Sequence, residues 1–365
     1  MYHKRIQLQV FLLILLCFVL TGGCNRKKPP EPEQIFIEQD EAETAEPLVT
    51  GESGGLENTD IEFDDINGQQ LHNRTSVQPS FSGLNLSSIG GKINTYELNP
   101  VNYENPDIDI LKHMGAQQYL ISFLEGEQFY RSGNYDKALA EYTASINENR
   151  DFTQALISRG NTLLRLGEIV RAIDDYTRAI RLDDNKSEVF NYRGFARAEL
   201  AQQRSDSAAA KNNMLSLAID DFTRAISLNA DYADALINRS HALYETGEYG
   251  RVIEDCNRII RLEPQNASAW NRRGSAWYQV GDGDKAINDF TQAIRLRGSY
   301  ALAFYNRGNV WYAKGELDRA LADINRALAI NPSYANAYST RANIFHEQGN
   351  IESAVADFEA ALQNR

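Results

Sequence analysis

Apolar and small residues recur at helical spacing in two neighbouring stretches of about thirteen residues, and this pair of stretches repeats along the chain from Tyr119 onward. A glycine with polar neighbours, as in Gly315-Glu316, separates the two stretches and is typical of a turn. Pro264 and Pro332 close their units, because proline cannot continue a helix. The pattern therefore predicts a series of helix-turn-helix hairpins.

The hairpins follow a period of 34 residues. A small residue takes one place in the first stretch of each unit: Gly126, Gly160, Gly194, Ser240, Gly274, Gly308 and Ala342. A large or apolar residue takes one place in the second: Tyr142, Tyr176, Phe222, Cys256, Phe290, Ile324 and Phe358. The result is seven units, at 119–152, 153–186, 187–232, 233–266, 267–300, 301–334 and 335–365. The third unit carries twelve extra residues at about 201–212, in a polar segment rich in Ala, Gln and Ser. This segment is expected to be either a helix extension or a flexible loop.

These two places explain how one hairpin packs and why the units must stack. A small residue such as Gly160 or Gly308 lets two helices approach closely, and the large residue of the second helix fills the gap between them. A single hairpin cannot bury its apolar faces alone, so neighbouring units must cover one another. The sequence therefore predicts an all-α solenoid.

The spacings resemble those of the tetratricopeptide repeat over residues 119–365. Departures are modest: Cys256 and Ile324 stand where the family usually has an aromatic residue, Val252 replaces an alanine, and Gly283 loosens one turn. The resemblance implies a right-handed superhelical solenoid of seven repeats, whose first helices line a concave groove that binds peptides or helices of other proteins. It implies an interaction protein rather than an enzyme.

The resemblance also places a set of amide and aromatic side chains in the groove: Asn161, Asn191, Asn271, Tyr244, Tyr278, Tyr305, Asn309, Tyr312, Asn343 and His346. Asparagine can bond to both N–H and C=O of an extended peptide, and tyrosine offers a flat apolar ring with a polar tip. Tyr244, Tyr278 and Tyr312 repeat down one line, so units four to six are the best candidate site. The alternative is that these side chains cover neighbouring helices.

An arginine recurs in the first helices and an acid in the second helices. Pairing within a unit would set Glu125, which replaces the arginine of the first unit, against Glu141. Pairing each acid with the arginine of the next unit avoids this contact between like charges. The second scheme is therefore preferred, and it predicts the pairs Glu141–Arg159, Asp175–Arg193, Asp221–Arg239, Asp255–Arg273, Asp289–Arg307 and Asp323–Arg341, with Asp357 left over.

The N-terminus has the features of a bacterial lipoprotein signal, over residues 1–23. Lys4 and Arg5 precede an apolar run that is short of the ~20 residues of a membrane-spanning helix. Two glycines then lead into Cys24, the expected site of lipidation, although Thr21 stands where such signals usually have a larger aliphatic residue. Plain secretion and an uncleaved anchor are the alternatives. We expect a lipid-anchored protein of the bacterial cell envelope, with Cys256 as its remaining cysteine, a small core residue.

Residues 24–106 are predicted to form a disordered acidic tether. The formal net charge of the chain is -13, and thirteen acids fall at 29–70 without one basic residue. Low hydrophobicity with charge of one sign disfavours folding. Two interpretations of this segment remain: a spacer, and a docking strip for a basic partner. A lead-in helix, capped by Asp107, is expected at 107–118. Because the rest of the chain is nearly neutral, a nucleic-acid partner is not expected.

Catalytic motifs are not found: the five histidines have no ligand spacing, and no phosphate-binding glycine loop or nucleophile elbow occurs. The preferred function is a membrane-anchored adaptor that binds an envelope protein, without a cofactor or metal. The alternative is an accessory subunit of a transport or assembly machine that handles a solute or lipid. The last unit lacks the usual polar capping helix, so Val355, Phe358 and Leu362 could form a homodimer contact, or the terminal helix could fray.

Overall fold

The computed structural model of the chain describes residues 108–113, 115–203 and 207–364. The predicted signal, Cys24, the acidic tether and the capping residue Asp107 lie outside these ranges. Within them, no helix combines the length and the apolar character needed to cross a bilayer.

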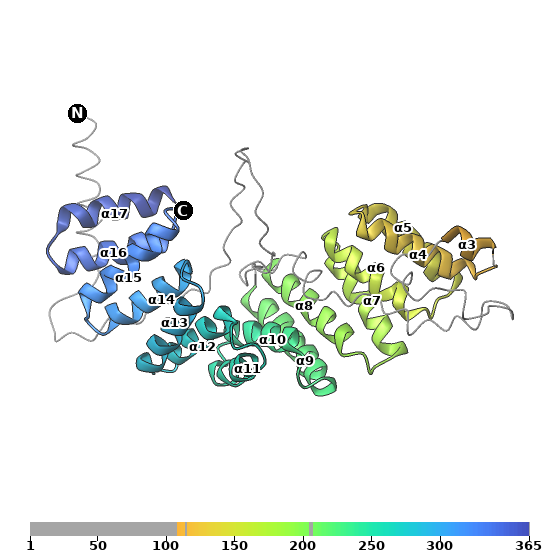
Figure 1. The fold of residues 1–365 in the computed structure, drawn as a ribbon, viewed down its shortest axis with the longest axis horizontal. Helices are drawn as coiled ribbons and strands as arrows, with labels where there is room; N and C mark the ends of the chain where they lie inside the picture. The colour runs from red at the N-terminus through yellow and green to blue at the C-terminus, as the bar shows by residue number, and fades with distance from the viewer. Residues whose placement is uncertain (1–107, 114, 204–206, 365) are drawn as a thin grey trace, which may run out of the picture.

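Every regular element of the described ranges is an α-helix, so the predicted all-α fold is confirmed (Figure 1). The lead-in helix α3 spans Ile108–His113 and is shorter than predicted. Seven helix pairs follow: α4 (Gln118–Arg131) with α5 (Tyr135–Glu148), α6 (Thr153–Arg165) with α7 (Ile169–Leu182), α8 (Ser187–Gln203) with α9 (Ala208–Leu228), α10 (Ala233–Glu245) with α11 (Tyr249–Leu262), α12 (Ala267–Gln279) with α13 (Gly283–Leu296), α14 (Ala301–Ala313) with α15 (Leu317–Ile330), and α16 (Ala335–Glu347) with α17 (Ile351–Gln363).

A left-handed glycine ends the first helix of most pairs. Gly133 has φ 76° and Gly281 has φ 89°, conformations in which a side chain would be strained. The next residue often caps the second helix. Asn134 accepts a hydrogen bond from the backbone N–H of Lys137 at 3.3 Å, and Asp282 accepts one from Lys285 at 3.1 Å. The glycine turn that the sequence predicts is therefore present.

The small residue inside the first helix lets the two helices of a pair approach. A Cβ on Gly160 would lie 2.6 Å from Cε1 of Tyr176, whose side chain is fully buried. Gly194 has the same relation to Phe222, at 2.7 Å, and Gly274 to Phe290, at 2.8 Å. Real Cβ atoms do not come this close, so a larger residue at these three sites would force the facing ring to move.

Pairs stack in chain order, with the second helix of one pair against the first helix of the next, and the array forms an open arc (Figure 1). Consecutive first helices also touch directly, as α4 touches α6 and α14 touches α16. In a curved stack, the elements that approach one another lie on the inner side. The first helices therefore line the inner face of the arc.

The described residues of the extra segment in the third unit lengthen its two helices. α8 continues to Gln203 and α9 begins at Ala208, with the Ser207 hydroxyl as its cap, at 3.3 Å from the N–H of Ala210. The described part of this segment is therefore a helix extension. One of its residues, Lys211, donates to Glu245 of α10 at 2.9 Å and so joins the extension to the following repeat.

Candidate partner-binding face

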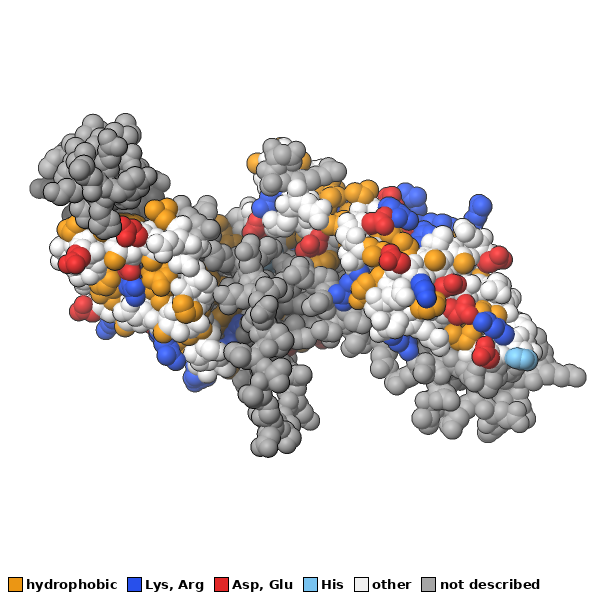
Figure 2. All heavy atoms as spheres, turned by 90° about the horizontal axis from the view of Figure 1, so that it is seen from above, with side chains coloured by type: hydrophobic (Ala, Val, Ile, Leu, Met, Phe, Trp, Pro, Cys, Tyr) orange, Lys and Arg blue, Asp and Glu red, His pale blue; other side chains and the backbone are white. Residues whose placement is uncertain are grey.

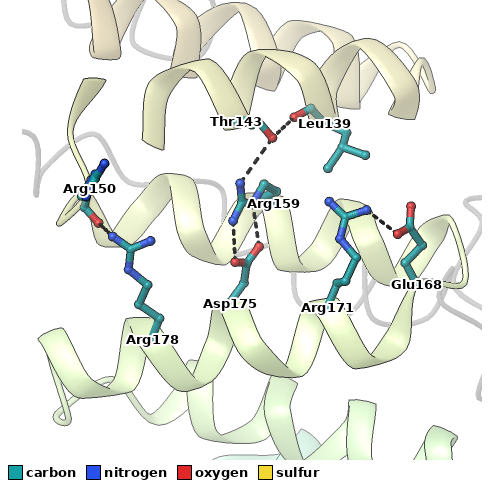
Figure 3. A network of polar contacts seen from close by, with 8 residues as sticks. All are labelled: Leu139, Thr143, Arg150, Arg159, Glu168, Arg171, Asp175 and Arg178. Carbon is teal, nitrogen blue, oxygen red and sulfur yellow. Dashed lines mark hydrogen bonds and ion pairs between the residues drawn. The ribbon is translucent and has the colours of Figure 1, made fainter. Parts of the chain in front are cut away.

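Each arginine of the first helices pairs with the acid of its own unit. Nε and Nη2 of Arg159 donate to the two carboxylate oxygens of Asp175, each at 2.7 Å (Figure 3). The same two-pronged contact joins Arg193–Asp221, Arg239–Asp255, Arg273–Asp289, Arg307–Asp323 and Arg341–Asp357. The predicted pairing between units is wrong: Glu141–Arg159, Asp175–Arg193, Asp221–Arg239, Asp255–Arg273, Asp289–Arg307 and Asp323–Arg341 are not the pairs that form.

The arginines nevertheless connect neighbouring repeats, through a different group. Nη1 of Arg159 donates to the Thr143 hydroxyl on α5 of the preceding unit, at 3.3 Å, so this side chain lies between α5 and α7 (Figure 3). The same nitrogen of each later arginine donates to the corresponding side chain of the preceding unit at 2.7–3.2 Å, namely Thr177, Thr223, Asn257, Thr291 and Asn325. One guanidinium thus closes its own hairpin and contacts the previous one.

The first unit shows why the argument from like charges failed. Glu125 stands in the place of the arginine and would face Glu141, but Lys112 of α3 donates to Glu125 Oε1 at 2.7 Å. Burial raises the pKa of Glu141, the Glu125 charge raises it further, and Lys112 lowers it. A cation from outside the repeats therefore offsets the repulsion, which the periodicity of the repeats does not predict.

Four of the predicted groove residues are buried. Asn191 is 0% exposed, and its amide oxygen accepts from Asn238 Nδ2 at 3.0 Å. Asn271 accepts from Asn306 at 3.2 Å, and Asn309 from Thr340 at 3.2 Å, while the Tyr305 ring packs on Tyr334 with centroids 4.8 Å apart. The prediction that Asn191, Asn271, Asn309 and Tyr305 face a ligand is wrong. These side chains are buried and make contacts between neighbouring units.

Asn161 is half-buried and serves the interior of its own hairpin. The hydroxyl of Tyr176 donates to Asn161 Oδ1 at 2.6 Å. In the preceding unit, Glu127 takes the same place and accepts from the Tyr142 hydroxyl at 2.8 Å. A buried phenol needs an acceptor, so a tyrosine at this place of the second helix selects a polar residue on the first.

The line of tyrosines remains partly accessible. Tyr244, Tyr278 and Tyr312 are half-buried and lie near the C-terminal ends of α10, α12 and α14. Tyr244 accepts from Gln279 Nε2 at 3.4 Å, and Tyr312 donates to Glu347 at 2.9 Å. These bonds connect a tyrosine of one first helix to the next first helix, and each half-buried ring keeps some exposed area.

Of the two remaining groove candidates, both on α16, Asn343 is half-buried and His346 is exposed. Charged side chains of both signs lie interspersed with hydrophobic ones on the described surface seen from above the arc (Figure 2). Among the described residues, no three His, Cys, Asp or Glu side chains gather as metal ligands. The first helices therefore offer partly accessible tyrosine rings and amide side chains.

A polar cluster on the first helices of units four and five was missed. Arg272 is 5% exposed, and its Nη1 donates to the Ser240 hydroxyl at 3.0 Å and to the Ile237 carbonyl at 3.2 Å. Burial and the charge of Arg272 lower the pKa of His241 to about 4. On α8 of unit three, burial raises the pKa of Glu199 to about 7. The sequence carried one signal of this cluster: Arg272 stands at a place where the other units have a neutral residue.

The thiol of Cys256 belongs to the core. It is fully buried, and burial raises its pKa to about 12. A thiol that stays protonated is a poor nucleophile. The prediction that Cys256 is a small core residue is confirmed.

Comparison with known proteins agrees with this architecture. Models of the tetratricopeptide repeat match residues 123–187, 274–315, 308–349 and 335–365. A tetratricopeptide repeat protein from Parabacteroides merdae ATCC 43184 has a similar fold, with a TM-score of 0.54 and 20% identity over 68% of this chain and 93% of that one. No protein of curated function matches the chain.

Two further solved structures are similar at lower TM-scores. YrrB, described as a TPR protein with an unusual peptide-binding site, has a TM-score of 0.46 and 22% identity over 54% of this chain and 95% of its own. The MamA protein has a TM-score of 0.45 and 24% identity over 50% of this chain and 94% of its own. The family models and the helix pairs together show that the chain contains tetratricopeptide repeats.

Proposed function

We propose that the array is an interaction scaffold that binds a peptide or helix of another protein on its inner face. The observation that carries this proposal is the line of half-buried rings of Tyr244, Tyr278 and Tyr312 on three consecutive first helices. The other polar groups of this face, such as Asn191 and Asn271, are already used between repeats. The tyrosines are therefore the best candidates for contact with a partner.

Rings held in this way suit recognition. A tyrosine supplies a large contact area with few rotatable bonds, so little conformational entropy is lost when a partner binds. The bonds of Tyr244 to Gln279 and of Tyr312 to Glu347 already restrict these side chains. Preorganised rings at the repeat spacing would favour an extended or helical segment that runs along the arc rather than a compact ligand.

Photo-crosslinking tests the binding site. We expect p-benzoylphenylalanine at position 278 or 312 to capture the same discrete partner in the native cells. The matched control places the same residue at Val170 of α7, a second helix, where the side chain is 54% exposed. Thermal melting of the purified variants shows that each is folded. Capture of identical products from positions 170, 278 and 312, or of none from 278 and 312, would contradict the proposal.

We further propose that a lipid on Cys24 holds the scaffold on a membrane of the bacterial cell envelope, with the acidic segment as a spacer. The support is the pattern of charged, apolar and small residues before Cys24. In cells fed an alkyne fatty acid, we expect the wild type to be labelled and to sediment with membranes. Cys24→Ser should remove both properties, and unchanged labelling of this variant would exclude Cys24 as the lipid site.

A further inference from the structure

The second helix of the last unit, α17, leaves uncovered a face that every earlier second helix buries. Phe358 is 37% exposed, whereas its six counterparts are all 0% exposed. These counterparts are Tyr142, Tyr176, Phe222, Cys256, Phe290 and Ile324. Leu362 is 68% exposed, whereas Leu328, at the same place of α15, is 7% exposed. The uncovered face continues along the helix to Ile351, which is 53% exposed.

The earlier units show what kind of element fits this face. Ile324 and Leu328 of α15 form one core cluster with Ala337 and Ile344 of α16, the first helix of the following unit. A first helix with a narrow apolar side is therefore what this surface accommodates. Such a helix also brings an arginine, as α16 brings Arg341.

The polar edge of the same face differs in α17. At all six junctions, Nη1 of the incoming arginine meets a neutral threonine or asparagine on the preceding second helix, as Arg341 meets Asn325 at 2.7 Å. The corresponding residue of α17 is Glu359, one period after Asn325. A guanidinium binds a carboxylate more strongly than a neutral oxygen, because the hydrogen bond is charge-assisted.

We propose that this face of α17, made of Ile351, Val355, Phe358 and Leu362 with Glu359 at its edge, binds an amphipathic helix of another protein that presents an arginine to Glu359. The apolar side of that helix would cover Phe358 and Leu362, as α16 covers α15. Recognition of a helix by an apolar surface with a charged edge is a common mode of peptide binding.

A second copy of this chain fits the face poorly. Its first repeat has Glu125 where an arginine is needed, so head-to-tail stacking would present no guanidinium to Glu359 at this place. An antiparallel pair of α17 helices would place Glu352 and Glu359 of both copies on the same side of the contact, because these two residues flank one edge of the apolar face. Charge therefore favours a basic helix of a different protein.

Fluorescence anisotropy with a peptide that copies residues 335–347, whose Arg341 is the incoming arginine of α16, tests the proposal on the full chain. We expect the peptide to bind, and Glu359→Arg to weaken its affinity at least tenfold. A peptide carrying Arg341→Glu should bind the wild type weakly and regain affinity for Glu359→Arg. Leu362→Glu should prevent binding of both peptides, and circular dichroism checks that each variant is folded.

Several results would overturn the proposal. Absence of peptide binding to the wild type, or equal binding of both peptides by wild type and Glu359→Arg, would remove the role of the charge. Sedimentation that shows a dimer of the wild type, dissociated by Leu362→Glu, would identify a second copy of the chain as the occupant instead.

Discussion

The aspartates that pair with an arginine are between 1% and 7% exposed. At this burial, the paired arginine is what offsets the cost of taking their negative charge out of water. Burial raises the pKa of Asp289 even though Arg273 donates two hydrogen bonds to it. Removing two charges from water costs nearly as much as their attraction returns, so such pairs add little net stability but are costly to break. We infer that they fix the relative position of the two helices of a hairpin.

One repeat contains both a buried and an exposed ion pair. The side chains of Arg239 and Asp255 are 13% and 2% exposed, and those of Arg251 and Glu248 are each 43% exposed. Asp255→Asn leaves a buried guanidinium without its counter-charge, so we expect a loss of about 3 kcal/mol in the free energy of unfolding. Glu248→Gln should cost about 0–1 kcal/mol. Chemical denaturation that gave equal losses for the two variants would contradict the structural role of the buried pair.

Glu199 predicts a pH dependence. Its pKa is raised by burial to about 7 from the ordinary 4.5, so the folded protein holds the proton more tightly than the unfolded chain does. Stability from this group is present below about pH 4.5 and is lost as the pH rises through 7. Glu199→Gln cannot ionise. We expect it to raise the melting temperature relative to wild type at pH 8 and to have little effect at pH 4. The same difference at both pH values would contradict this assignment.

At the scale of the element, the lead-in helix α3 supplies, through Lys112, the positive charge that the first repeat lacks. Lys112 bonds Glu125, and this contact lies in the place where the other six repeats have an arginine. The first repeat is therefore stabilised partly by a residue that lies outside its own hairpin. Its two helices should open more readily than those of the other repeats when this contact is lost.

Substitution at the first repeat tests this role of α3. We expect Lys112→Ala to speed hydrogen exchange in α4 and α5, because Glu125 and Glu141 then face each other without a cation. Glu125→Arg should slow that exchange, because it restores the within-repeat pair with Glu141. Faster exchange for Glu125→Arg than for wild type would show that the first repeat is built on a different pairing.

The hairpins could be predicted from the sequence, but several contacts between them could not. Gly160 and Tyr176 belong together because helix approach requires a small residue opposite a large one, and a single sequence shows this. The partner of Arg159 is less certain from spacing, since acids lie both before and after it. Whether Asn191 faces a groove or a neighbouring helix depends on the rotation of α8, and hydropathy does not determine this rotation for a polar residue.

At the scale of the whole molecule, the arc is stabilised by contacts between neighbours. Each core cluster joins consecutive pairs, as Phe195 of the third unit clusters with Cys256 of the fourth. Stability in such arrays is a sum of weak single units and favourable interfaces between them, so it grows with the number of units. The inner face and its tyrosines exist only where several first helices are held side by side.

Circular dichroism and thermal melting of a length series test this central claim most directly. The series is residues 301–334, residues 233–365 and the full chain, compared per residue. We predict that residues 301–334 alone show little helix, that residues 233–365 are helical and unfold cooperatively, and that the full chain melts at a higher temperature still. A single hairpin with full helicity and the melting temperature of the long array would contradict the account.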